Sequence, residues 1–466
     1  MSAGPIINRK SSDESANSRF GDQSLAARLA GGRETVSMGK KSSANKKVPT
    51  RPALAGIIFF IVSFAAMYFA FTVMTTTAMY QGSFESNDGT GSSSRLGRGP
   101  NNLSTKAAVG REIAAGSLAL IELRYPNGVF CDLDFSAYKK NPSLFPMAKD
   151  LIMRSKCRGV RRLQYGLSEA AKLARDYDEK NGLAANGVPA GFVFHESRCG
   201  STLAANALAV IEGTRVFSES APIPHALKEF PSNSPSSGTG DELVKDIIYL
   251  MSRFSPTYFK FQSIIDQTRL LSLFPSVPWI FIYRDPVQVM VSHLGKDPSL
   301  RKGLPPKGNA GCARPSIRLN PTSELLSLVR EKLGKSSLRR GVSSLSEENI
   351  CAAHLATLCS AALRNAKSSG TGMLVNYDNI METLVDDVIP HHFGVNLSER
   401  DRERLAEVGS VYSKARAPGN AWVNDGEQKE RSSTKEIVKA ADTFLSDVYQ
   451  ELKDVSEERK GILRDA

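Results

Sequence analysis

The sequence lacks the cysteine patterns of small disulfide-rich domains and of zinc sites. It has 6 cysteines in 466 residues, and no CxxC pair occurs among them. The number is too low for a disulfide scaffold, and the spacing fits no metal-ligand motif. An even number of cysteines permits disulfides without proving any. Cys351 and Cys359 are eight residues apart in a predicted helix, about 12 Å along its axis, so they cannot pair with each other.

Charged side chains are absent from residues 52–84. Residues 54–74 are about 21 mostly apolar positions, enough for a helix to cross a bilayer. Lysines and an arginine precede them, and no cation follows before Arg95, so we predict a cytosolic N-terminus and a luminal or extracellular remainder. A cleaved signal peptide is the alternative, disfavoured by the segment's length and position. Sequons at Asn102 and Asn396 support this topology only weakly.

The excess positive charge is local. Of the net +12, residues 1–51 contribute +6 and residues 295–344 contribute +8. This profile indicates a basic tail and a basic loop, not a general nucleic-acid binder. We predict a disordered cytosolic tail at 1–51, a transmembrane anchor at 52–80, a flexible stem at 81–110 and a catalytic domain at 111–466, with 295–344 as a basic insertion.

Strand and helix patterns alternate in the predicted catalytic domain. Short buried strands are predicted at 191–194, 214–218, 257–261, 279–283 and 372–376, with helices at 201–212, 242–253 and 349–365. A capping box at 433–436 predicts the start of one more helix, with an apolar face that runs to Leu452. The alternation implies an α/β fold with a central parallel sheet flanked by helices.

Residues 191–209, GFVFHESRCGSTLAANALA, predict a buried strand, a tight turn and the start of a helix. Unpaired backbone N–H groups at such a helix start bind anions, and Arg198, Ser201 and Thr202 add to the attraction. The GxxxxGK[ST] spacing is missing, which disfavours a nucleotide triphosphate with magnesium. Taken alone, an ordinary strand-to-helix turn explains the pattern equally well.

A second motif is WIFIYRDPVQVMVSHL at residues 279–294. Arg284 follows a buried strand, at the end where ligands bind in open α/β sheets, and Ser292 lies eight residues further on. An arginine fork and a hydroxyl suit a second phosphate. The alternative is a structural Arg284–Asp285 loop with Ser292 as a neutral helix residue.

Together the two motifs resemble the sulfotransferase family, in its membrane-bound and bacterial-type branches. HESRCGSTL is similar to the loop that holds the 5′-phosphosulfate of 3′-phosphoadenosine-5′-phosphosulfate (PAPS), and YRDPVQVMVS to the motif for its 3′-phosphate. The resemblance covers about half the chain and implies a P-loop-type central parallel sheet with PAPS as co-substrate and no metal. It implies these cofactor-binding residues: Arg198, Cys199, Gly200, Ser201, Thr202, Arg284 and Ser292.

The resemblance also implies catalytic roles for Arg198 and Glu219. Arg198 stabilises the departing 5′-phosphate, because charge builds there in sulfuryl transfer. Glu219 follows the second predicted strand and is the expected base, with a pKa raised by its pocket. His195 and His225 are competing bases. A structural role as a partner of Arg215 is the alternative for Glu219.

Cys199 replaces the commoner serine of this loop. Beside Arg198 at a helix N-terminus, its thiol is predicted to have a lowered pKa and to react with alkylating reagents unless cofactor is bound. A small packed residue, indifferent to such reagents, is the alternative.

The basic insertion at 295–344 suggests an anionic acceptor, such as a uronate-bearing or sulfated glycan. A solvated loop without a role is the alternative. The first hypothesis is therefore a single-pass, type II Golgi-membrane sulfotransferase that acts on a carbohydrate or other secretory-pathway hydroxyl. The others are an inactive membrane-anchored protein that binds anionic glycans, and a P-loop nucleotide kinase.

Overall fold

Five parallel strands form the central sheet. The computed structural model describes residues 101–155, 157, 162–183, 187–295, 311–338 and 341–465. The strands are β4 (Gly191–His195), β5 (Arg215–Ser218), β6 (Thr257–Lys260), β7 (Trp279–Tyr283) and β8 (Gly372–Asn376). Their order in the sheet is β5-β6-β4-β7-β8, and every neighbouring pair is parallel. The predicted α/β class with a central parallel sheet is confirmed, and the sheet is compatible with a P-loop-like fold.

Both faces of this sheet are buried, because side chains alternate between two packed layers. One layer is largely aromatic: Phe192, Phe194, Phe217, Phe259, Trp279, Phe281 and Tyr283 all belong to one core cluster. The other is mostly aliphatic: Val193, Val216, Ile280, Ile282, Met373 and Val375 belong to a second cluster. This explains why the strands read as continuous apolar runs in the sequence.

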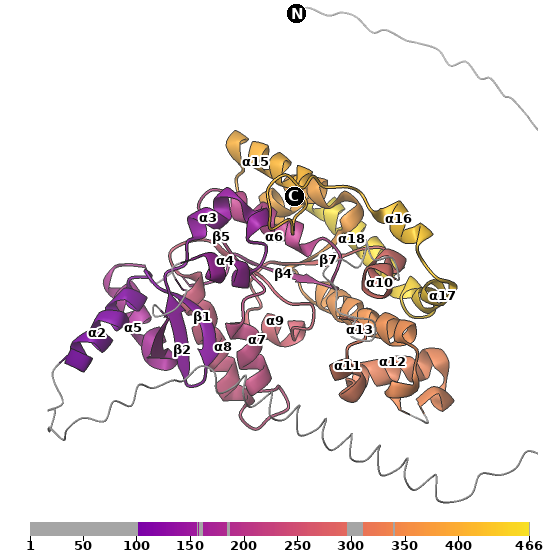
Figure 1. Cartoon of the computed structure of the whole chain (residues 1–466), viewed down its shortest axis with the longest axis horizontal. Coiled ribbons are helices and arrows are strands. Elements are labelled where there is room, and N and C mark those ends of the chain that lie inside the picture. The colour runs from indigo at the N-terminus through magenta and orange to yellow at the C-terminus, as the bar shows by residue number, and fades with distance from the viewer. Residues whose placement is uncertain are drawn as a thin grey trace, which may run out of the picture. The chain divides into compact units, whose positions relative to one another are not determined.

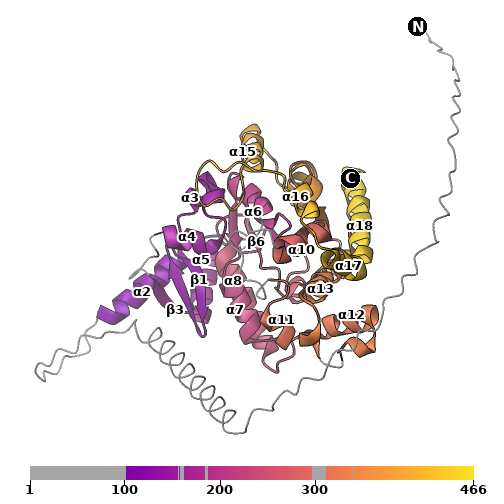
Figure 2. The same cartoon turned by 45° about the vertical axis from the view of Figure 1, so that its right-hand side comes forward.

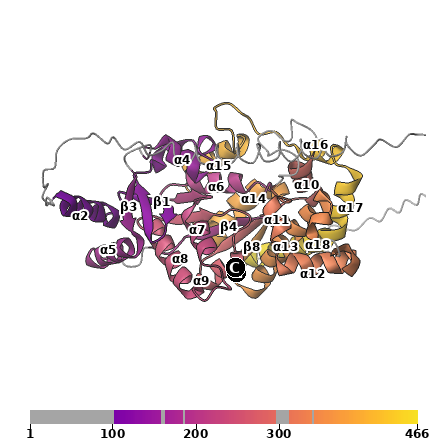
Figure 3. The same ribbon diagram turned by 60° about the horizontal axis from the view of Figure 1, so that its bottom comes forward.

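Helices cover both faces of the sheet (Figures 1 and 3). The aliphatic face packs on α6 (Ser201–Val210) and the π-helix η5 (Leu384–His392). The aromatic face packs on α8 (Ser237–Ser252), α13 (Glu347–Ser368) and α18 (Ser446–Asp465). Helix α6 is buried all round because α15 (Glu399–Ser410) packs on its outer side.

The strand order fixes where a ligand site can lie. The chain leaves β4 toward β5 on one side and leaves β7 toward β8 on the other. The loops after β4 and β7 therefore diverge at the carboxyl edge of the sheet, which is the usual binding crevice of such folds. The strand of each sequence motif ends at this crevice.

A second, antiparallel sheet lies N-terminal to the parallel one and was not predicted. Its strands are β1 (Ala119–Arg124), β2 (Asn127–Cys131) and β3 (Leu163–Gly166), in that order. It packs with α2 (Asn101–Ala114) and α5 (Leu167–Lys180) at one end of the described part of the chain (Figure 1). Helix α2 includes residues 101–110, which the sequence analysis assigned to the stem.

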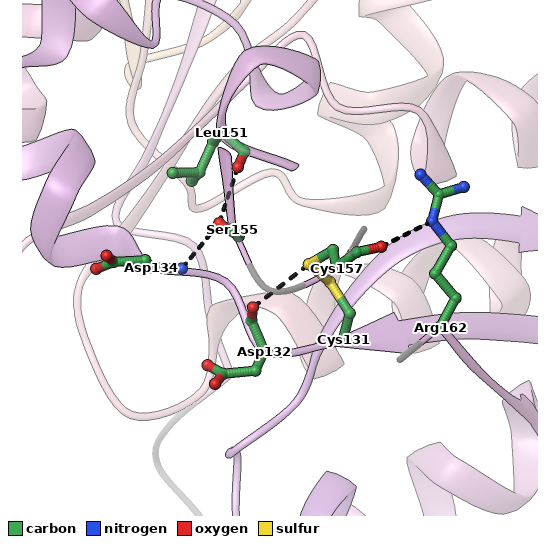
Figure 4. The surroundings of a disulfide bond; sticks show 7 residues. All are labelled: Cys131, Asp132, Asp134, Leu151, Ser155, Cys157 and Arg162. Carbon is green, nitrogen blue, oxygen red and sulfur yellow. Dashed lines mark hydrogen bonds between the residues drawn. A yellow bond between two sulfur atoms is a disulfide. The ribbon is translucent and has the colours of Figure 1, made fainter. Parts of the chain in front are cut away.

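Two disulfides are present among the described residues. Cys131 at the end of β2 pairs with Cys157, next to the Ser155 hydroxyl that donates to the Leu151 carbonyl oxygen (Figure 4). Cys312, within the predicted basic insertion, pairs with Cys351 of α13. The prediction that Cys351 does not pair with Cys359 is confirmed.

The remaining helices are short and connect these layers. They are α3 (Phe135–Lys140), α4 (Ala148–Arg154), α7 (Pro222–Glu229), α9 (Gln267–Leu273), α10 (Pro286–Leu294), α11 (Pro315–Leu319), α12 (Ser323–Leu333), α14 (Ile380–Thr383), α16 (Gly426–Arg431) and α17 (Lys435–Phe444). The predicted C-terminal helix is present, but its N-cap is Thr434, whose hydroxyl accepts from the Ile437 N–H, and not Ser433 of the predicted capping box. It is divided into α17 and α18 at Leu445.

The predicted tail and membrane anchor, and the stem as far as residue 100, lie outside the described residues. Among the residues that are described, no helix has the length and apolar character needed to span a membrane.

Candidate functional site

The loop that follows β4, residues 196–200, is called the cradle loop here. Ser197, Arg198 and Gly200 all have positive φ angles, of 87°, 56° and 86°. Left-handed residues in succession curl the chain, so that backbone N–H groups turn toward one concave side. Gly200 is required, because a Cβ there would lie 2.4 Å from the ring of Tyr377. Non-glycine residues in this conformation concentrate at functional sites.

The side chain of His195 holds the cradle loop in place through two hydrogen bonds. Its Nδ1 accepts a hydrogen bond from the Ser197 N–H at 2.9 Å, and its Nε2 lies 2.9 Å from the Phe261 carbonyl oxygen. The ring is therefore neutral, with its proton on Nε2, and burial lowers the pKa of His195 to about 3. Because both ring nitrogens are occupied, His195 is a structural residue of the loop and not a free base.

Glu196 joins the two loops of the crevice. Its side chain is 2% exposed, and Oε1 accepts from the Arg284 N–H at 2.5 Å. Burial raises the pKa of Glu196 to about 8. The sequence analysis assigned no role to Glu196, because that role depends on the Arg284 backbone, which the sheet brings alongside.

The lowered pKa predicted for Cys199 is wrong. The residue is fully buried, and its thiol donates to the Ile282 carbonyl oxygen at 3.0 Å. Burial raises the pKa of Cys199 to about 12 instead of lowering it. The side chain faces β7 while the backbone of the loop faces the crevice, so the helix N-terminus does not activate the thiol.

The first turn of α6 completes the cradle. Ser201 and Thr202 are 5% and 2% exposed, and the Thr202 hydroxyl oxygen is buried without a hydrogen-bond partner among the described residues. Arg198 is half-buried, and its guanidinium forms no hydrogen bond or ion pair with another described side chain or backbone group. A cation and a hydroxyl are thus left available beside a helix N-terminus.

Arg284 directly follows β7 and is held by protein groups. Its Nε donates to Gln288 Oε1 at 2.7 Å, and its Nη2 donates to Asp425 Oδ1 at 2.9 Å. The guanidinium lies 4.1 Å from the ring centre of Tyr377. Asp425 also pairs with Lys429 at 2.8 Å, and α16, which begins directly after Asp425, lies beside α10 (Figure 2). A carboxylate therefore occupies the anion position between two cations.

Ser292 is not presented to the crevice. Its side chain is 1% exposed, and its hydroxyl donates to the Gln288 carbonyl oxygen within α10 at 2.8 Å. This geometry is that of the structural alternative, a serine satisfied by its own helix.

The raised pKa predicted for Glu219 is wrong. Burial favours the neutral acid, but the charge and hydrogen bond of Lys260, with which Glu219 forms an ion pair, act together with other neighbouring groups to outweigh it and lower the pKa of Glu219 to about 2. The Glu219 N–H also donates to the Lys260 carbonyl oxygen at 2.7 Å. The other candidate base, His225, is exposed on α7.

Two lysines to which the sequence analysis assigned no role also belong to this site. Lys260 ends β6, next to β4, and its side chain is fully buried. Burial lowers the pKa of Lys414 to about 7, with the charges of Lys260 and Arg198 as the next causes. The sequence pattern that could have indicated Lys260 is a lysine between two phenylalanines at the end of a predicted strand. Nothing in the sequence indicated that Lys414 lies near Lys260.

A comparison with models of known protein families finds no match for this chain, and a comparison with curated proteins finds none either. Among the described residues, no group of three or more His, Cys, Asp or Glu side chains could hold a metal ion.

Proposed function

We propose that this chain is a PAPS-dependent sulfotransferase that transfers a sulfuryl group to a hydroxyl of a glycan or another secretory-pathway acceptor. One observation carries the proposal. The cradle loop and Arg284 lie at the carboxyl ends of two adjacent strands, β4 and β7, where the loops of the sheet diverge. The site thus offers two separate anion positions, as a nucleotide with phosphates at both ends of its ribose requires.

The cradle loop suits the 5′-phosphosulfate. Backbone N–H groups at the start of α6, the free guanidinium of Arg198 and the unpartnered Thr202 hydroxyl can all contact phosphate oxygens. Charge builds on the bridging oxygen and the 5′-phosphate as the S–O bond breaks. Arg198 would stabilise that charge, and because arginine stays protonated it acts as a cation and not as an acid.

The second anion position suits the 3′-phosphate. Arg284 and Lys429 already share one carboxylate, that of Asp425. A phosphate that replaced the carboxylate would meet the same two cations with more charge and more acceptor oxygens. Ser292 is omitted from this set, because its hydroxyl is buried in α10.

The two disulfides support a location in an oxidising compartment. They agree with a type II Golgi-membrane protein whose catalytic domain is luminal, anchored by residues 52–80. The basic insertion supports an anionic acceptor, and no metal is required for the proposed reaction.

The occupied Arg284 favours a second candidate, a membrane-anchored protein that keeps the fold and binds anionic glycans without a cofactor. Asp425 would then be a permanent partner of Arg284, and only the cradle loop would meet a ligand. The two candidates differ in whether 3′-phosphoadenosine-5′-phosphate (PAP) binds.

Thermal unfolding of the full-length chain in detergent separates these candidates. PAP is expected to raise the melting temperature, since a ligand present at 100 times its Kd stabilises the folded state by about 2.7 kcal/mol. ATP with magnesium is expected to have a much smaller effect. Arg198→Ala and Arg284→Ala are each expected to reduce sulfuryl transfer from PAPS by about 100-fold or more. Arg124→Ala, an exposed arginine of β1, is the control. Transfer at close to the wild-type rate in both crevice variants would refute the proposal.

A further inference from the structure

A small cavity borders the cradle loop. Its volume is about 30 Å³, which is room for a water molecule or a single hydroxyl group but not for a sugar ring. The polar residues of its lining include Glu196, Ser197, His293, Arg314 and His354. Ser197, Arg314 and His354 are half-buried, so three residues of the lining reach the surface.

His293 is the unusual residue of this lining. It lies on α10 and is 4% exposed, yet neither ring nitrogen has a hydrogen-bond partner among the described residues. A buried imidazole without partners costs free energy. The cost is explained if one nitrogen meets a polar group of a ligand in the cavity.

The opposite wall is held in place by a disulfide. Cys312 lines the cavity and is bonded to Cys351, one turn before His354 on α13. Gly311 lies against the ring of His293, where a Cβ would be 3.2 Å from Cε1. The disulfide and the glycine together hold the segment close to His293 without filling the cavity.

The cavity adjoins the cradle loop of the proposed site of sulfuryl transfer. Ser197 and Glu196 of the cradle loop form part of its lining, and Ser197 directly precedes Arg198. The charge of Arg198 also acts on His293. A hydroxyl in the cavity would therefore lie beside the phosphosulfate held by the cradle loop.

We propose that this cavity receives the acceptor hydroxyl and that His293 is the catalytic base that takes its proton. The inference rests on the proposed function and replaces Glu219 and His195 as candidate bases. The acceptor oxygen forms a bond to sulfur, and the bond from sulfur to the bridging oxygen breaks. Its electron pair goes to the 5′-phosphate of PAP, and the hydroxyl proton moves to a ring nitrogen of His293.

The charges around His293 suit this role once anions are bound. Burial, together with the nearby charges of Arg198, His354, Arg314 and Lys414, lowers the pKa of His293 to about 3. The imidazole is thus neutral and has a lone pair available. The phosphosulfate would offset the charge of Arg198 and so raise the pKa of His293 from that value, which makes the imidazole a better base.

Arg314 indicates the class of acceptor. Its Nε donates to the Gly311 carbonyl oxygen at 3.2 Å, and its other nitrogens form no hydrogen bond with described residues. They are free to bind an anion at the mouth of the cavity. The acceptor is therefore a hydroxyl with a carboxylate or sulfate nearby, as on a uronate-containing glycan.

The test uses the full-length chain in detergent, with PAPS carrying radiolabelled sulfate and two acceptors: an unsulfated polymer of uronate and amino sugar, and a neutral glucan. The variants are His293→Asn and Arg314→Ala. The control is His391→Asn, since His391 is exposed and lies at the opposite edge of the sheet. Its neighbour His392 contacts Trp279, the first residue of β7.

His293→Asn is expected to bind PAP as the wild type does and to lose about 100-fold or more in kcat, the usual contribution of a general base. Arg314→Ala is expected to raise the KM for the uronate polymer with less effect on kcat, and His391→Asn to match the wild type. Higher kcat/KM on the uronate polymer than on the glucan supports the assigned acceptor class.

Other outcomes separate the inference from the proposed function. If the wild type does not bind PAP, the proposed function fails and the inference with it. If PAP binds and His293→Asn keeps more than a tenth of the wild-type kcat, only the inference fails. PAP binding without transfer to either polymer also overturns the inference, because the cavity then serves no such acceptor.

Discussion

The cradle loop and the Arg284 segment end adjacent strands of one sheet but differ in what their arginines contact. Arg198 has no hydrogen-bond partner among the described residues, and its loop is fixed through His195, Glu196 and Cys199 instead. Arg284 is 4% exposed and is held by Gln288, Asp425 and Tyr377. One cation is free on a rigid loop, and the other is already paired.

This difference shows how a fold can prepare two anion positions in different ways. At the cradle loop, three positive φ angles give the backbone its curled shape before any ligand binds. Because Arg198 has no hydrogen-bond partner among the described residues, an anion binds there without displacing a protein group. At Arg284 an anion must displace the Asp425 carboxylate, which is 39% exposed and can turn away into solvent. The cradle loop is preorganised, whereas the second position binds by exchange.

The largest expected effect separates the two arginines. Arg198→Ala is expected to reduce kcat by about 10²–10³-fold, the usual cost of one charge-stabilising donor. It should leave the free energy of unfolding almost unchanged. Arg284→Ala is expected to reduce transfer and also to lower the free energy of unfolding by about 1–3 kcal/mol, because it removes buried hydrogen bonds. Turnover assays measure kcat, and urea unfolding measures the free energy of unfolding. Equal destabilisation by both variants would show that Arg198 and Arg284 do not differ in how the protein holds them.

Gly200→Ala tests the strain of the cradle loop. The new Cβ must adopt a φ of 86° and meets the ring of Tyr377, so a loss of about 2–3 kcal/mol in unfolding free energy is expected. Gly213→Ala is the matched control, because Gly213 has a φ of 78° but no atom within 4 Å of a Cβ. Its cost should be about 1 kcal/mol. Equal losses in urea unfolding would mean that Tyr377 does not confine the loop.

The pH dependence of PAP binding distinguishes the two positions further. Burial lowers the pKa of Lys414, near Arg198, to about 7 and that of Lys429, near Arg284, to about 8. A bound phosphate favours the charged amine, so affinity falls as the pH rises through each value, by at most about tenfold per pH unit for each lysine. Calorimetry should show that Lys414→Met removes the step near pH 7 and Lys429→Met the step near pH 8. An affinity that increases with pH contradicts this assignment.

Asp425→Asn tests binding by exchange at Arg284. Removal of the carboxylate charge leaves Arg284 and Lys429 without their anion, so PAP affinity is expected to rise by about three- to tenfold, an effect of about 1 kcal/mol. Glu427→Gln, an exposed carboxylate of the same helix, is the control and should have no effect. If Asp425→Asn weakens PAP binding, Asp425 is part of the ligand site and not a competitor.

Cys199 gives the smallest expected effect. Its buried thiol should react with iodoacetamide no faster with PAP absent than with PAP present, as mass spectrometry of the labelled protein can measure. Rapid labelling that PAP prevents would mean that the cradle loop opens in solution. The cradle loop would then not be more rigid than the Arg284 position, where an anion binds by exchange.

The sequence predicted the parallel sheet well because its strands are buried on both faces and therefore form continuous apolar runs. It missed the antiparallel sheet of β1 to β3, where residues such as Glu122 and Gln164 interrupt the pattern. It also joined α17 and α18, since apolar residues keep the same spacing across the break at Leu445. Side-chain roles were predicted less well, because a pKa depends on neighbours that only the fold supplies.

The sequence by itself determined the five strands of the parallel sheet and the two loops that carry Arg198 and Arg284, because local spacing of apolar and polar residues fixes these elements. Only the tertiary structure decided which groups are free. In the folded chain Glu219 forms an ion pair with Lys260, and Arg284 forms one with Asp425. Cys199 is buried against β7, and His293 lines a cavity. These contacts join residues up to 141 positions apart, and burial and charge at such contacts set the chemistry of a site.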